Sequence, residues 1–95
     1  MKRKYRILGI APYLNLKNAM ITAAKKYEEI EITAYTGNLE DGVQLAIQYM
    51  NQKFDLILSR GGTAEMIREV ATIPVVEIPI SINDILRATL LLDNL

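Results

Sequence analysis

The sequence predicts an α/β fold, a three-layer sandwich in which helices cover both faces of a parallel sheet of four strands. Strand-like segments alternate strictly with helical patterns, and this alternation is typical of parallel sheets with right-handed crossovers. Hydrophobic residues make up 51% of the 95 residues, enough for the core of one small domain. We therefore expect residues 1–95 to form a single α/β domain.

The predicted strands cover residues 5–11, 30–36, 54–59 and 74–79. The first and third are apolar almost throughout, as strands buried on both faces are. The second alternates between apolar and polar residues, which indicates a half-exposed strand at an edge. Pro74 stands at the start of the fourth strand, where proline is tolerated. The expected strand order is 2-1-3-4, that of a flavodoxin-like or Rossmann-like sheet.

Amphipathic patterns predict the helices between the strands. The first helix follows the turn at Pro12 and has one apolar stripe, made of Leu16, Ala19, Met20, Ala23, Ala24 and Tyr27. The second follows Gly37, with Asn38 as a candidate N-cap. Gly42 lies inside this second helix and costs it about 1 kcal/mol relative to alanine.

A fourth helix, predicted from about residue 83 to the C-terminus, is apolar on nearly all sides. Ala88, Leu91 and Leu95 fall outside its core-facing stripe. Such a helix needs a second apolar surface to cover it. We expect that surface to come from another copy of the chain, giving a homodimer through this helix, or from another domain.

The most informative stretch is the turn after the third strand. It consists of Ser59, Arg60, Gly61, Gly62 and Thr63. The two glycines let a ligand approach bare backbone N–H groups, and the helix start that follows favours an anion. Arg60 adds a permanent positive charge. Thr63 is the candidate N-cap of a helix over residues 63–71, with Glu65 in its first turn, where a carboxylate suits the helix dipole.

With the strand order 2-1-3-4, a ligand binds beyond the carboxyl ends of the first and third strands. The loop after the first strand brings Pro12, Tyr13 and Asn15 to this rim, and Ser81 follows the fourth strand. Tyr13 would supply an aromatic wall and Asn15 an amide. Each has a structural alternative: loop packing for Tyr13, helix capping for Asn15 and Ser81, and a solvated charge for Arg60.

The residue types favour binding over catalysis. The chain has neither cysteine nor histidine, and the rim offers no convincing nucleophile–base pair. Asp55 stands at the start of the third strand, at the opposite end of the sheet from the rim. Glu77, inside the fourth strand, either faces solvent or pairs with Arg60. We expect no catalytic residue, no cofactor and no metal site.

The net charge and the hydropathy of the chain bear on whether it binds nucleic acid or a membrane. Eleven basic and eleven acidic residues cancel, so no global field draws the chain to nucleic acid or to a membrane surface. No apolar run reaches the roughly eighteen residues that a membrane helix needs. We expect a cytoplasmic chain with no direct nucleic-acid contact and no membrane association.

Three segments together resemble the N-terminal sensor domain of the propionate catabolism activators, bacterial transcription regulators that work with the alternative sigma factor. These segments are residues 54–65, FDLILSRGGTAE, residues 73–78, IPVVEI, and residues 84–88, DILRA. The resemblance spans most of the chain, is most specific around residues 59–65 and is looser before residue 54. Asn83 stands where the family leads us to expect an aromatic residue.

The resemblance implies a two-lobed α/β sensor that binds a small organic acid, such as a methylcitrate-like effector, between its lobes. In such regulators an ATPase domain and a helix-turn-helix DNA-binding domain follow the sensor. This chain corresponds to the first lobe, so we expect it neither to hydrolyse ATP nor to bind DNA. The residues alone also allow a small enzyme or carrier acting on phosphorylated or carboxylated metabolites, or a dimerisation module.

Overall fold

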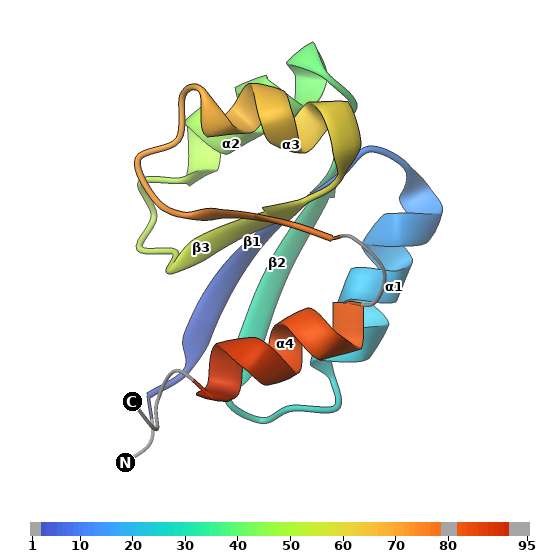
Figure 1. Cartoon of the computed structure of the whole chain (residues 1–95), viewed down its shortest axis with the longest axis vertical. Helices are drawn as coiled ribbons and strands as arrows, with labels where there is room; N and C mark the ends of the chain where they lie inside the picture. The colour runs from blue at the N-terminus through green and yellow to red at the C-terminus, as the bar shows by residue number, and fades with distance from the viewer. Residues whose placement is uncertain (1–2, 79–81, 92–95) are drawn as a thin grey trace.

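The computed structural model describes residues 3–78 and 82–91. The sheet contains four parallel strands in the order β2-β1-β3-β4, which confirms the predicted fold class and strand order. The strands are β1 (Tyr5–Ala11), β2 (Ile30–Thr36), β3 (Leu56–Ser59) and β4 (Val75–Glu77). The helices are α1 (Leu14–Ala24), α2 (Glu40–Tyr49), α3 (Gly61–Arg68) and α4 (Ile82–Leu91) (Figure 1).

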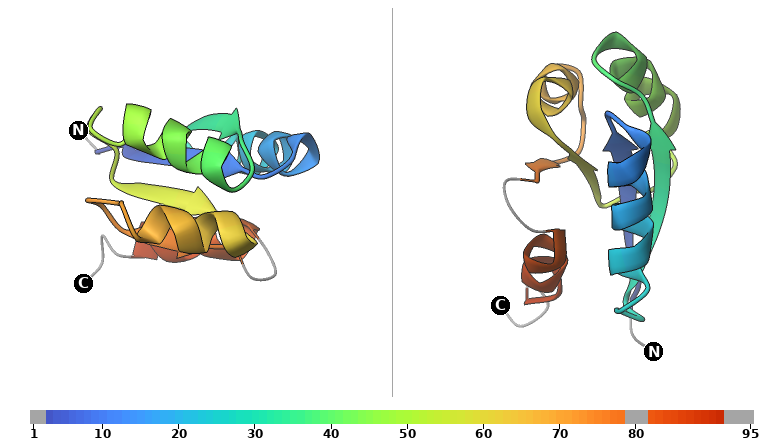
Figure 2. Two further views of the ribbon diagram at one scale, coloured as in Figure 1. Left: turned by 90° about the horizontal axis from the view of Figure 1, so that it is seen from above. Right: turned by 90° about the vertical axis from the view of Figure 1, so that its right-hand side faces the viewer.

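Helices α2 and α3 cover one face of the sheet, and α1 and α4 lie on the other (Figure 2). Two apolar clusters, one on each face, hold the three layers together. Because side chains alternate along a strand, successive residues of β1 enter different clusters: Ile7 packs with α1 and α4, whereas Leu8 packs with α2 and α3. The centre of the sheet excludes water, since Ile7, Leu8, Ile57 and Leu58 have no exposed surface. The predicted burial of the first and third strands is therefore confirmed.

Several element ends differ from the sequence-based predictions. β4 is shorter than predicted and includes neither Pro74 nor Ile78, although the Ile78 N–H still donates to the Ser59 carbonyl at 2.9 Å. β3 begins at Leu56, later than predicted, although the Asp55 N–H already donates to the Arg6 carbonyl oxygen of β1 at 2.8 Å. In α4 the structure describes residues 82–91, so the predicted continuation to Leu95 lies outside the described residues.

The N-cap predicted for α2 was wrong. The cap position is Leu39, not Asn38, and Leu39 has φ 49° and ψ −118°. A positive φ of this kind is unfavourable for a side chain that is not glycine. The Leu39 N–H is held by the Thr63 hydroxyl, whose Oγ1 accepts it at 2.8 Å. A contact from α3 therefore fixes where α2 begins.

Gly42 lies where α2 meets α3, and its hydrogen is required there. A Cβ built on Gly42 would lie 2.5 Å from Thr63 Cγ2 and 2.7 Å from the Gly37 carbonyl oxygen. Both distances are far below van der Waals contact. Glycine at position 42 lowers the helix propensity of α2, but it allows α2 to pack closely against Thr63 of α3.

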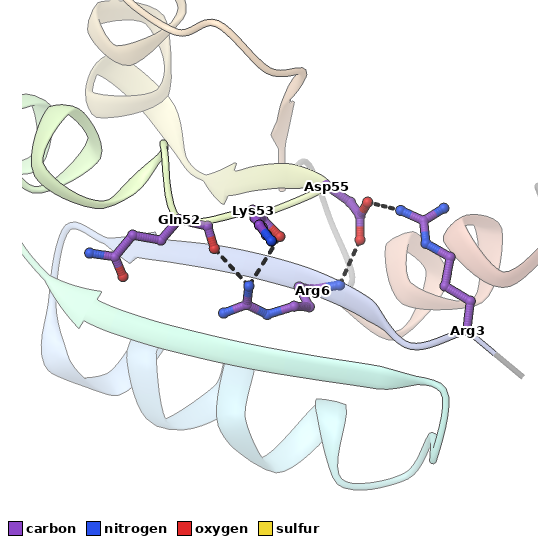
Figure 3. A network of polar contacts seen from close by, with 5 residues as sticks. All are labelled: Arg3, Arg6, Gln52, Lys53 and Asp55. Atoms are coloured by element: carbon purple, nitrogen blue, oxygen red, sulfur yellow. Dashed lines mark hydrogen bonds and ion pairs between the residues drawn. The ribbon is translucent and has the colours of Figure 1, made fainter.

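A polar network fixes the amino ends of β1 and β3 (Figure 3). The Asp55 carboxylate accepts the Arg6 backbone N–H at 2.8 Å and pairs with the Arg3 guanidinium. The Arg6 guanidinium donates to the carbonyl oxygens of Gln52 and Lys53, at 2.6 and 3.2 Å. These contacts hold the turn before β3 against β1. Asp55 lies at the amino end of the sheet, as the sequence predicted.

Candidate functional site

The candidate site lies where β1 and β3 end. The two strands are parallel neighbours, so their carboxyl ends reach the same edge of the sheet, and each leads directly into a helix, α1 or α3 (Figure 1). This is the switch point of the strand order, the place where open α/β sheets bind ligands. The structure thus brings the loop with Pro12 and Tyr13 beside the turn of residues 59–63.

Ser59 joins the two strand ends. Its side chain is fully buried, and its Oγ donates to the Ile10 carbonyl oxygen at 2.7 Å. The hydroxyl therefore forms a hydrogen bond within the protein, and this bond connects β3 to β1 just below the rim. Ser59 was predicted as a ligand-binding residue, and this geometry gives it a positioning role.

Replacing Ser59 with alanine is expected to lower the free energy of unfolding by about 1 kcal/mol, the net value of one buried hydrogen bond. Urea denaturation followed by circular dichroism measures this loss. Thr36→Ala removes an exposed hydroxyl at the end of the edge strand β2 and should change stability by less than about 0.5 kcal/mol. Equal stability of Ser59→Ala and wild type would show that the bond contributes nothing.

Arg60 and Tyr13 meet at the rim. Arg60 Nη1 donates to the Tyr13 hydroxyl at 3.3 Å, and the two residues are the extended N-cap residues of α3 and α1. The Tyr13 side chain remains 47% exposed, and the guanidinium has further donors to offer. A cation and a phenol from two different loops therefore lie on one side of the site.

The first turn of α3 supplies backbone donors. The helix begins at Gly61, whose φ of 62° suits glycine, and no atom outside its immediate neighbours lies within 4 Å of a Cβ built there. The first N–H groups of a helix have no intrahelical acceptor and carry the positive end of the dipole. Gly61, which has open space beside it, and Gly62 therefore contribute N–H groups next to the Arg60 charge. This arrangement favours an anion.

The cap role predicted for Thr63 was wrong, because α3 starts at Gly61 and Arg60 occupies the cap position. The Thr63 side chain is buried, and its Oγ1 accepts the Leu39 N–H at 2.8 Å and donates to Asn38 Oδ1 at 3.1 Å. Its hydroxyl thus connects α3 to the loop before α2. The backbone N–H of Thr63 remains in the first turn of the helix.

Glu65 lies in the second turn of α3, since the helix starts earlier than predicted, and no acidic residue occupies the first turn. Its carboxylate pairs with Arg68 at 2.9 Å on the exposed helix surface. The start of α3 consequently has no carboxylate of its own to repel an anionic ligand.

The remaining residues named in the sequence analysis differ in exposure and in their distance from the turn. Pro12 is half-buried in the loop after β1, whereas Asn15 is exposed in the first turn of α1. Glu77 on β4 lies opposite Ser59 of β3 in the strand register. Within the described residues, Glu77 forms no ion pair with Arg60. Ser81 lies outside the described residues.

Leu39 is a rim residue that the sequence analysis missed. It is 47% exposed, and its Cδ2 lies 3.4 Å from the position of a Cβ on Gly62. An apolar side chain therefore lies beside the turn of residues 59–63. Backbone strain of the kind seen at Leu39 is often found at functional sites. A leucine after Gly37 and Asn38 carries no sequence signal for a positive φ.

Tyr35 and Tyr49 stack near the edge of the sheet, with ring centroids 4.3 Å apart and an interplanar angle of 6°. Partial burial raises the pKa of Tyr35 above its usual 10.0, and the hydrogen bond with Tyr49 raises it further. No group of three or more potential metal ligands occurs among the described residues.

Comparison with known proteins gives one result. The family model described as "Propionate catabolism activator" matches residues 26–95, which include the turn after β3 but not the loop after β1. No curated protein and no solved structure matches the chain. In the described part of the chain, no helix combines the length and the hydropathy that crossing a membrane requires.

Proposed function

Because the chain belongs to the propionate catabolism activator family, whose members are regulatory domains of transcription activators, we propose that it is the effector-sensing module of such a regulator. Its effector is a small organic acid of the methylcitrate type. The observation that carries this proposal is the first turn of α3, where the N–H groups of Gly61 and Gly62 lie beside Arg60 and the space next to Gly61 is open.

A polycarboxylate matches the chemistry of this rim. One carboxylate accepts the N–H groups of the first turn of α3, and a second forms a bidentate pair with the Arg60 guanidinium. Tyr13 orients that guanidinium through its hydroxyl. Leu39 offers an apolar contact to a methyl or ethyl branch. The rim thus selects for several negative charges and a short apolar group.

The module senses and does not catalyse. It contains no histidine or cysteine, and the serine and threonine hydroxyls beside the site donate to protein oxygens. In this proposal residues 1–95 are the first lobe of a two-lobed cytoplasmic sensor. Effector binding against a second lobe controls the ATPase and DNA-binding domains of the regulator, and this lobe itself does not contact DNA.

A thermal-shift screen of the chain tests the proposal, with 2-methylcitrate, citrate and propionate in one arm and inorganic phosphate and sugar phosphates in the other. We expect 2-methylcitrate to raise the melting temperature more than propionate, because a single carboxylate satisfies only part of the rim. Stabilisation by phosphorylated metabolites alone would favour the small enzyme or carrier. No stabilisation by any anion at millimolar concentration would favour a dimerisation module.

We also propose that the chain associates with itself through α4. Leu91 on this helix is 58% exposed. Burying one leucine side chain contributes about 1.5–3 kcal/mol, and a two-fold dimer counts each contact twice.

A further inference from the structure

An apolar cavity of about 460 Å³ opens between α4 and the β3–β4 half of the sheet. The described residues that line it are Arg3, Tyr5, Asp55, Leu56, Pro74, Val76, Ala88 and Thr89. It lies on the face opposite α2 and α3 and around the amino ends of the strands, away from Arg60. The effector proposal makes no use of this cavity.

The position of α4 explains the cavity. Leu86 is fully buried in the cluster that α4 shares with α1, and Leu90 packs against the same cluster. These two leucines anchor the helix against the α1 cluster, while Figure 2 shows α4 below the β3–β4 half of the sheet. The side chains of Leu56 and Val76, farther along the same face, border the cavity.

From these features we infer that the cavity receives Leu91 of a second copy of the chain, while that copy's cavity receives Leu91 of the first. Ala88 lines the cavity, and Leu91 follows one helical turn later with 58% of its surface exposed. Residues three apart lie on one helix face. An apolar hole and an apolar side chain next to each other on one helix are self-complementary under two-fold symmetry. The inference rests on the proposed self-association through α4.

The charges at the cavity do not oppose a second copy as the occupant. Arg3 and Asp55 border it and form an ion pair. Because the two groups neutralise each other within one chain, the border of the cavity carries no net charge that would repel a second copy. The chain has eleven basic and eleven acidic residues, so two copies approach without net repulsion.

Sedimentation equilibrium of the whole chain tests the inference with two variants and a control. Leu91→Glu puts a charge on the inserted side chain, and Ala88→Phe fills the cavity from an exposed helix position. Ile47→Glu changes an apolar residue of similar exposure, 44%, on α2 at the opposite face. We expect the wild type to dimerise with a Kd at or below roughly 10 µM, and each α4 variant to raise the Kd at least ~100-fold. Ile47→Glu should match the wild type.

The possible results distinguish self-association, insertion of Leu91 into the cavity and binding of a small molecule there. A monomeric wild type at about 100 µM overturns both the self-association and the cavity inference. A dimer that Leu91→Glu disrupts but Ala88→Phe leaves intact overturns the cavity inference alone. If the wild type is monomeric and binds toluene, and Ala88→Phe abolishes that binding, the cavity is a small-molecule site. Circular dichroism confirms folding of each variant, and the anion screen reports on the effector proposal independently.

Discussion

Replacement of Arg60 by alanine is expected to weaken binding of a tricarboxylate such as 2-methylcitrate by about 1.5–3 kcal/mol, a loss of roughly 10- to 150-fold in affinity. The guanidinium is the charged group at the rim that can pair bidentately with a carboxylate, and its bond to Tyr13 at 3.3 Å holds it near the first turn of α3. Isothermal titration calorimetry of wild type and variant measures the difference directly.

Two further substitutions give the prediction its controls. Arg68→Ala removes an exposed arginine at the far end of α3 from Arg60 and should leave the affinity within a factor of about two. Arg60→Lys keeps the charge but not the fork, so its affinity should fall between those of wild type and Arg60→Ala. Equal affinities for wild type and Arg60→Ala would show that the carboxylate binds without Arg60.

The second large expected effect is on the free energy of unfolding: Gly42→Ala should lower it, although helix propensity alone would raise it. Gly42→Ala should be stabilising by about 1 kcal/mol if only propensity mattered. In the structure the new methyl group would lie 2.7 Å from the Gly37 carbonyl oxygen, and backbone cannot rotate away as a flexible side chain can. We expect a net destabilisation of about 2 kcal/mol, typical of overpacking, measured as a lower urea midpoint at unchanged m-value.

Gly62→Ala is the matched control, because Gly62 is also a helical glycine but is exposed. Its Cβ would meet Leu39 Cδ2 at 3.4 Å, an ordinary contact. This variant should be as stable as wild type or more stable, by up to about 1 kcal/mol. If both glycine variants gain stability, α2 and α3 are not packed as closely as the structure shows.

The fold could be predicted because its signals are local and repeated. Apolar residues throughout the first and third strands, and alternation in the second, follow from the number of buried faces each strand has. The start of α2 could not be predicted, because a distant contact decides it. Leu39 adopts its positive φ where Thr63 Oγ1 accepts its N–H, and these residues are far apart in the sequence.

The site was only partly predictable for a similar reason. Strand order and the Gly61–Gly62 turn indicated an anion-binding rim, and the structure brings Arg60 and Tyr13 together there. The sequence could not reveal that the Ser59 hydroxyl donates a hydrogen bond to the Ile10 carbonyl oxygen, because that bond depends on the register of β3 against β1. The contribution of Ser81 stays a prediction.

The central position of β1 has a consequence for how the chain is made. β1 leaves the ribosome first and pairs with β2 on one edge, but its other edge pairs with residues 56–58, which are made later. At roughly 5–20 residues per second, that edge and the apolar faces of β1 wait for seconds before β3 arrives. The nascent chain therefore passes through a period in which a strand from the centre of its sheet is open on one side. Protection by a chaperone matters most in this interval, and slower translation before β3 would lengthen it.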